Sequence, residues 1–327
     1  MRESKPTIYD PNFLPNMIYS GVPSWLNLSV IENDDDLKKI DAAVVGVPWE
    51  GGCTIGGYSS TTEGPKAVRS ASIRYTGFLP DYNLDCFDYL NVADSGDIAT
   101  QNGNYDFTFK SIRERIGKLA DAQIIPITIG GDHGIAYPII SEIAKRYPKK
   151  VGVLHFDAHL DNYSHFGDDE LSRCSPFYRV YNDPNMDPTK IAHIGIRGPR
   201  NHREEYNNAV KYGATVIRAI DVHEDGWKAS ISKALEVVSK DTEYIYITVC
   251  ADSLDAANMP QAPQDMGGLT SYELLMMLHE AGLAGAKGID FVETYPEVFT
   301  LQTAAHVVNW AFLYYLNGLA QHIKESK

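Results

Sequence analysis

Three side chains of metal-binding type lie at alternate positions after an apolar stretch. Asp157, His159 and Asp161 occupy the back half of the segment 151–163, whose apolar front half is long enough for one buried strand. On extended backbone, alternate residues point to the same side. A lone Asp or His at a strand end is more often a helix cap or a solvated loop residue. Three at this spacing predict a divalent-metal site, because buried carboxylates need a cation or several donors to offset lost hydration.

Apolar segments alternate with helical patterns on both sides of this stretch. We expect further strands at 42–48, 124–129, 191–196, 215–219, 244–249 and 288–292. We expect helices from Gly64, over 107–122, 139–147, 231–238 and 304–319, and after a capping box at 270–273. Such alternation favours parallel strands joined by right-handed crossovers. The predicted fold class is therefore α/β, a single three-layer domain with a mostly parallel central sheet flanked by helices.

Further polar side chains follow other predicted strands. His133 follows one strand, Cys250 and Asp252 follow a second, and Glu293 follows a third. In open parallel sheets, the ligand site lies outside the carboxyl ends of the strands. We therefore expect these four residues to gather near the segment 157–161, at one edge of the sheet.

Composition restricts the classes of partner and compartment. The chain has 327 residues and a formal net charge of −14. This charge argues against a general affinity for nucleic acid or anionic membranes, whose phosphates attract basic surfaces. No apolar run reaches membrane-spanning length, and no signal-peptide core follows Met1. The four cysteines lack CxxC spacing, which favours reduced thiols, so we expect a cytoplasmic protein. Cationic small molecules remain compatible with the net charge.

The first forty residues differ from the rest of the chain. They contain four prolines between positions 6 and 23 and an acidic run at 32–36, which predicts an irregular arm followed by a loop. A partner subunit could hold such an arm. No linker divides the remaining residues, so we expect an N-terminal arm over 1–40 and one domain over 41–327.

Several motifs occur in one order along the chain. They are GVPWEGG (46–52), GPKAVR (64–69), GGDHG (130–134), HFDAHLD (155–161), VCADSLDAANMP (249–260), GGLT (267–270) and GIDFVETYP (288–296). Together they resemble the ureohydrolase family, which comprises arginase, agmatinase, guanidinobutyrase and relatives. The resemblance extends to the end of the chain and is highly specific. It implies an arginase-like catalytic domain over 41–327 and a homo-oligomer, either a trimer or a hexamer.

The resemblance also implies a role for each candidate residue. In the family, two Mn²⁺ ions, sometimes Ni²⁺, are held by ligands that correspond here to His133, Asp157, His159, Asp161 and Asp252. The family glutamate that pairs with the substrate guanidinium falls on Glu293, which could otherwise be a surface carboxylate at a strand end. Two cations can lower the pKa of a water to near neutrality. Asp161 would assist proton transfer while Glu293 orients the substrate.

Two residues depart from the family pattern. Cys250 stands where relatives have a bridging aspartate; a thiolate can also bridge, although it favours Zn²⁺, Ni²⁺ or iron over Mn²⁺. Cys250 could equally be a small buried cysteine with one metal lost. Arg173, in SRCSPFYR (172–179), replaces a histidine that shuttles protons, and arginine cannot do so. Arg173 could pair with an acidic group or bind a substrate carboxylate, and His165 could substitute as the shuttle.

Three functions are open at this point. The first is a metal-dependent hydrolase of linear C–N bonds in a guanidino or amidino compound, releasing urea and an amine. The second is a catalytically silent homologue that acts as a binding or regulatory subunit. The third is an amide or acetyl-group hydrolase with one metal, which Glu293 disfavours because a neutral amide gains nothing from a carboxylate there. We expect the loops 164–173 and 256–266 to shape the pocket.

Overall fold

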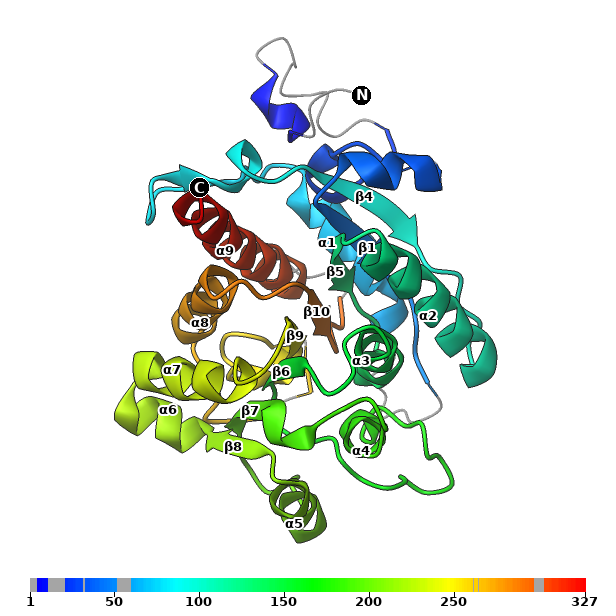
Figure 1. The fold of residues 1–327 in the computed structure, drawn as a ribbon, viewed down its shortest axis with the longest axis vertical. Helices are drawn as coiled ribbons and strands as arrows, with labels where there is room; N and C mark the ends of the chain where they lie inside the picture. The colour runs from blue at the N-terminus through cyan, green and yellow to red at the C-terminus, as the bar shows by residue number, and fades with distance from the viewer. Residues whose placement is uncertain are drawn as a thin grey trace.

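Eight parallel strands form the centre of the molecule. The computed structural model describes residues 5–10, 21–31, 33–51, 60–260, 262–263, 265–296 and 303–327. The strand order in the sheet is β4-β1-β5-β10-β9-β6-β7-β8, and the middle of this sheet is seen in Figure 1. The strands are β1 (Ala42–Gly46), β4 (Val92–Asp97), β5 (Ile125–Ile129), β6 (Val151–Phe156), β7 (Ile191–Ile196), β8 (Thr215–Arg218), β9 (Tyr244–Cys250) and β10 (Ile289–Val292). Neighbouring strands pair in parallel throughout, so their carboxyl ends share one edge.

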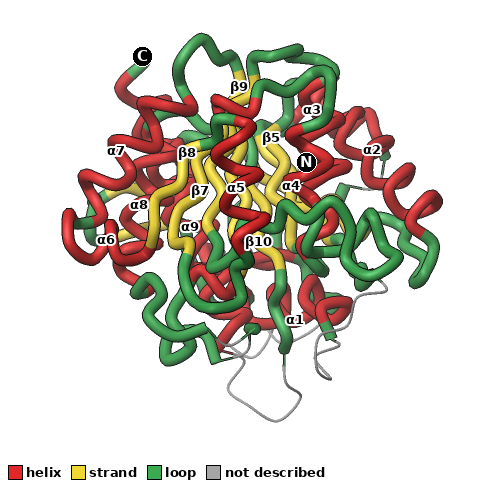
Figure 2. Tube along the Cα trace, turned by 90° about the horizontal axis from the view of Figure 1, so that it is seen from below, coloured by secondary structure: helices red, strands yellow, loops and turns green. Residues whose placement is uncertain are grey.

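Helices cover both faces of the sheet. One face carries α2 (Tyr105–Asp121), α3 (Ala136–Ala144) and α4 (Pro176–Tyr181). The other face carries α1 (Gly64–Ser72), α7 (Trp227–Val238), α8 (Ser271–Leu283) and α9 (Thr303–Glu325). The helices α5 (Arg203–Tyr212) and α6 (Ala219–Asp225) lie near β8, and a short hairpin joins β2 (Phe78–Leu79) to β3 (Leu84–Asp85). Figure 2 shows the strands between these helical layers.

The sequence of β6 explains why the sheet lies between two helical layers. All six of its residues are buried, as expected for a parallel strand covered on both sides. Val151 and Val153 belong to the hydrophobic cluster with α2 and α3, whereas Leu154 and Phe156 belong to the cluster with α8 and α9. Burying each such side chain stabilises the fold by about 1.5–3 kcal/mol.

Part of the predicted N-terminal arm packs against the body of the molecule. The Trp25 side chain is fully buried, and its Nε1 donates to Asn309 Oδ1 of α9 at 2.7 Å. The ring also meets Phe312 edge-on, with centroids 6.4 Å apart. Residues 1–4, 11–20 and Glu32 of the predicted arm, like Cys53, lie outside the described residues.

Most predicted elements are present, with local differences that have physical reasons. The helix expected over 139–147 is α3, which begins at Ala136 because the helical turn His133–Ile135 leads directly into it. The strand expected over 215–219 ends at Arg218, where α6 begins. The strand β4 and the helices α4, α5 and α6 were not predicted. Across the described ranges, none of the helices combines the length and hydrophobicity that crossing a bilayer requires.

Candidate active site

The carboxyl edge of the sheet brings the predicted site residues together. His133 follows β5, the segment 157–161 follows β6, Cys250 ends β9 and Glu293 follows β10. These four strands are neighbours in the order β5-β10-β9-β6. A cavity of about 300 Å³ opens at this edge, with Asp161, Arg173, Cys250 and Glu293 among its lining residues.

A tight turn after β5 fixes the position of His133. Gly131 allows the close approach of two backbone segments, because a Cβ at this position would lie 1.9 Å from the carbonyl oxygen of Trp49. The carboxylate of Asp132 then caps the turn His133–Ile135 by accepting the Gly134 N–H at 3.0 Å. These two residues explain why GGDH positions a histidine at the strand end.

The backbone after β6 is not extended, contrary to the prediction. The strand ends at Phe156, and Asp161 adopts a φ of +46°, a conformation that residues other than glycine rarely adopt. The chain curls around Asp157, whose Oδ1 accepts the His159 N–H at 2.6 Å. Asp157 and His159 therefore converge through a turn, rather than through strand alternation.

Two overlapping groups of metal-binding side chains share Asp157. In the first, one ligand atom each of His133, Asp157 and Cys250 lies within 4.8 Å of the others. In the second, the same holds for Asp157, His159 and Asp252. The shortest contacts are 2.9 Å from His133 Nδ1 to Asp157 Oδ2 and 3.1 Å from His159 Nδ1 to Asp252 Oδ2. The arrangement offers two adjacent positions for cations.

Asp161 lies beside the first group without belonging to either. Its Oδ2 is 2.9 Å from His133 Nδ1. Burial, together with the neighbouring charge of Asp157, raises the pKa of Asp161 to about 7. Its carboxyl group can therefore gain or lose a proton near neutral pH.

The donor atoms fit a divalent cation. His133 Nδ1 lies close to two carboxylate oxygens but makes no well-formed hydrogen bond, although it is buried. Burial alone would lower the pKa of His133, but Asp157 and Asp161 more than offset this effect, so the pKa lies well above its ordinary value. A cation would take the place of the proton that these carboxylates favour. Imidazole, carboxylate and thiol donors suit first-row divalent metals.

A buried hydrogen-bonded chain fixes the orientation of the His133 ring. The Thr248 hydroxyl donates to Asp290 Oδ1 at 2.6 Å, so its oxygen can accept from His133 Nε2, 3.1 Å away. This leaves Nδ1 facing the carboxylates. Tyr246 donates to the other Asp290 oxygen at 2.8 Å, and burial raises the pKa of Asp290 to about 6. Sequence reasoning missed Asp290, although it lies within the motif GIDFVETYP.

One arginine joins the loops on the β9 side of the site. The Arg197 guanidinium donates to the backbone carbonyl oxygens of Asp252 at 2.8 Å, Leu254 at 3.1 Å and Asp265 at 3.0 Å. The Asp265 carboxylate in turn lies 3.2 Å from His159 Nε2. Arg197 thus holds Asp252 and Asp265 in place around His159.

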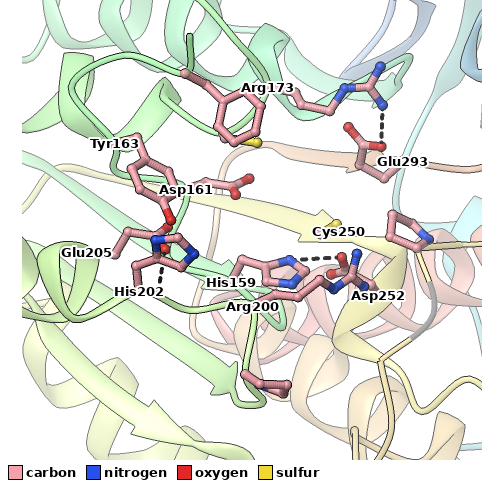
Figure 3. A pocket seen from close by; sticks show the side chains of 14 residues that line it. His159, Asp161, Tyr163, Arg173, Arg200, His202, Glu205, Cys250, Asp252 and Glu293 are labelled. Carbon is pink, nitrogen blue, oxygen red and sulfur yellow. Dashed lines mark hydrogen bonds and ion pairs between the residues drawn. The ribbon is translucent and has the colours of Figure 1, made fainter. Parts of the chain in front are cut away.

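Glu293 and Arg173 form a buried ion pair in the wall of the pocket (Figure 3). Glu293 Oε1 accepts the His133 backbone N–H at 2.8 Å, and Oε2 accepts from Arg173 Nη1 at 3.0 Å. Arg173 also donates to Tyr295 Oη at 2.7 Å and to Glu50 Oε1 at 3.2 Å. Of the alternatives open for Arg173, pairing with an acidic group is observed.

His165 does not take the place of the missing histidine in this structure. It is exposed, contacts Ser164 at 2.8 Å and is not among the lining residues of the pocket. The two loops expected to shape the pocket contribute Phe166, Arg173 and Pro263.

A third stretch of the pocket wall was missed. Arg200, His202 and Glu205 line the cavity, and Figure 3 shows His202 and Glu205 away from the Arg173–Glu293 pair. These three residues follow β7. The rule that ligand sites lie beyond the carboxyl ends of parallel strands, which indicated the other site residues, could therefore have indicated these three as well.

The parallel sheet and its two groups of donors define an α/β protein with a candidate two-cation centre. The Arginase family model matches residues 40–315, and the chain belongs to this family. It is 30% identical to the agmatinase of Chromobacterium violaceum over 88% of this chain and 87% of that protein. It is 31% identical to the human mitochondrial guanidino acid hydrolase over 88% of this chain and 79% of that protein. The solved structure of proclavaminate amidinohydrolase from Streptomyces clavuligerus matches with a TM-score of 0.84 and 25% identity. The match covers 93% of this chain and 99% of that protein.

Proposed function

We propose that this chain is a metal-dependent amidinohydrolase that releases urea from a guanidino compound. The observation that carries this proposal is the sharing of Asp157 by two groups of metal-binding side chains, in the same pocket as the Glu293 carboxylate. The agmatinase, guanidino acid hydrolase and proclavaminate amidinohydrolase to which the chain is similar support the same reaction class.

The residues divide the chemistry between them. A bound pair of divalent cations would supply a water of lowered pKa and a positive field. The residues that would hold the cations are His133, Asp157, His159, Cys250 and Asp252, with Asp161 beside them. Glu293 would accept hydrogen bonds from the substrate guanidinium and so orient its carbon. Asp161, whose Oδ2 lies 2.9 Å from His133 Nδ1, would carry a proton towards the leaving amine.

The proposal extends to the identity of the metal, the compartment, the oligomeric state and the division of the chain. We propose Mn²⁺ as the metal, with Ni²⁺ or Zn²⁺ as alternatives because Cys250 offers sulfur. Burial and the surrounding carboxylates raise the pKa of the Cys250 thiol well above its ordinary value, so ligation would require a cation to displace its proton. We also propose a cytoplasmic homo-oligomer, a trimer or a hexamer, with an arm over 1–40 and a catalytic domain over 41–327.

Metal analysis combined with urea release tests the proposal. We expect bound metal and urea formation from at least one compound of a guanidino panel. Asp157→Asn should lose both metal and activity, because both donor groups use this carboxylate. The loss should exceed the roughly 10–100-fold that removal of a supporting partner causes. Asp121→Asn, which alters a surface pair with Arg146, is the matched control. Metal-loaded protein that releases no urea from any compound would contradict the proposal.

A further inference from the structure

Arg173 places a guanidinium of the protein itself against the carboxylate that is proposed to hold the substrate guanidinium. Its Nη1 lies 3.0 Å from Glu293 Oε2, and its Nη2 lies 3.2 Å from Glu50 Oε1. The Arg173 side chain is only 4% exposed, although it contributes to the pocket wall. The oxygen that Glu293 would offer to a substrate is therefore already accepting from the protein.

The pairing of Arg173 is incomplete. Its Nε is buried and makes no hydrogen bond within the described part of the chain. Three carboxylates, those of Glu50, Asp132 and Glu293, lie within 4.0 Å of the one guanidinium. A buried donor without a partner destabilises the arrangement that contains it. Arg173 therefore retains capacity for another acceptor.

Displacing Arg173 from Glu293 is unfavourable unless both charges find new partners. Separating this buried pair would leave Glu293 without its cation and Arg173 with one acceptor fewer, although Glu50 would still lie 3.2 Å from Nη2. A substrate with only a cation would pair with Glu293 but would deprive Arg173 of one carboxylate. A substrate with only an anion would leave Glu293 without its cation. A substrate with both groups replaces one ion pair by two.

We propose that Arg173 is a specificity-determining residue that selects guanidino acids, by exchanging its partner Glu293 for the substrate carboxylate while Glu293 takes the substrate guanidinium. This inference rests on the proposed function and names the substrate class. Glu50 and Tyr295 keep Arg173 close to Glu293, so the two charged groups of the substrate must lie close together. The class is guanidino acids with one or two carbons between the guanidino nitrogen and the carboxylate.

The reaction of this class is balanced by water alone. The oxygen of water bonds to the guanidino carbon, and the bond from this carbon to the alkylated nitrogen breaks. One proton passes to the leaving nitrogen, and the products are urea and an amino acid. No oxidant or further reactant is required.

Kinetics of the metal-loaded enzyme on a small panel tests the exchange. The probes are guanidinoacetate, 3-guanidinopropionate and agmatine, which carries an amine in place of the carboxylate. We expect kcat/KM for the better acid to exceed that for agmatine by about 100-fold or more. Arg173→Met should reduce this ratio at least tenfold, and Arg173→Lys should give an intermediate ratio because lysine keeps the charge but not the planar fork. Arg146→Met, which removes an arginine from a carboxylate pair outside the pocket, should keep the wild-type ratio.

Binding measured by calorimetry separates this inference from the proposed function. If no compound yields urea, the proposed function fails, and the binding ratio of guanidinoacetate to agmatine still decides the inference. Preferential binding of the acid that is lost in Arg173→Met supports the exchange. Equal binding of acid and agmatine to the wild type, or an unchanged ratio in Arg173→Met, overturns it. Circular dichroism shows whether Arg173→Met is folded, and Arg173→Lys decides the question if it is not.

Discussion

Two buried arginines, each among carboxylates, have different surroundings. Arg69 of α1 meets Asp94 of β4 with two parallel hydrogen bonds, 2.7 Å from Nε and 2.9 Å from Nη2. Its Nη1 donates to Asp97 at 2.6 Å, so every guanidinium nitrogen has a partner. Arg173 has contacts through Nη1 and Nη2, but its Nε has none within the described part of the chain. Each guanidinium nitrogen of Arg69 thus has a partner, whereas one nitrogen of Arg173 lacks a partner among these residues.

The origin of the carboxylates explains this difference. Asp94 and Asp97 both belong to β4, so one rigid strand presents them together. The partners of Arg173 come from separate segments: Glu50 after β1, Asp132 after β5 and Glu293 after β10. A planar guanidinium can satisfy all its donors only where acceptors match its geometry. The comparison indicates that Arg69 stabilises the fold, while Arg173, next to the cavity, keeps one donor without a partner among the described residues.

The largest expected effect is on stability and tests the comparison directly. Arg69→Met leaves two carboxylates without their cation and should lower the free energy of unfolding by about 3–5 kcal/mol. Arg173→Met also leaves Glu293 without its cation, but it removes a buried Nε that has no partner among the described residues, so we expect a smaller loss of about 1–2 kcal/mol. Urea denaturation of both variants gives the values. Equal losses would remove the distinction between the two arginines.

A smaller effect should come from a buried carboxylate that has no arginine partner among the described contacts. Asp290→Asn weakens the acceptor that holds Thr248, and through it the His133 ring. We expect roughly 10–100-fold weaker metal binding with little change in the stability of the metal-free protein. Metal titration of Asp290→Asn and of Thr248→Val measures the effect. Unchanged affinity in both would show that the chain does not orient His133.

The last effect appears only below neutral pH and concerns a buried base that stays neutral, unlike both arginines. His279 on α8 stacks on Tyr82, with centroids 3.6 Å apart, and burial lowers its pKa to about 4. The unfolded chain, with a histidine pKa of about 6.5, binds more protons in this interval. The contribution of His279 to stability is therefore full above pH ~6.5 and falls as the pH falls towards 4, by at most about 1.4 kcal/mol per pH unit.

His279→Phe tests this pH dependence. Urea denaturation between pH 7 and 4.5 should show a shallower slope for the variant than for the wild type. Equal slopes would mean that His279 does not cause the loss. Arg69 and Arg173 should both stay positively charged between pH ~7 and ~4.5, because a guanidinium group does not titrate in this range.

Sequence periodicity was sufficient for the parallel sheet and for the edge at which the site lies. Strands such as β6 and β7 are mostly apolar, with one buried histidine in each, and the residues that follow them fall at the carboxyl edge by topology. The motif resemblance then indicated the individual ligand candidates. Both kinds of evidence depend on residues that are near one another in sequence.

The contacts between loops could not be predicted in the same way. The turn at Asp161 depends on a positive φ that no residue pattern indicated. The partners of Arg173 were left open because Glu50 and Glu293 come from opposite ends of the chain. Side chains from distant loops meet only once the backbone of each loop is known, and the motif at Glu293 carries no information about Glu50.

The position of β10 has a consequence for how the chain is made. The strand Ile289–Val292 lies between β5 and β9, although it is the last strand in sequence among the described residues. Until these residues leave the ribosome, β5 and β9 each have an open edge, and the two halves of the sheet have no strand to join them. His133 belongs to one half, and Asp157 and Cys250 belong to the other. A nascent chain therefore cannot hold His133 beside Asp157 and Cys250 in this sheet before β10 has been made.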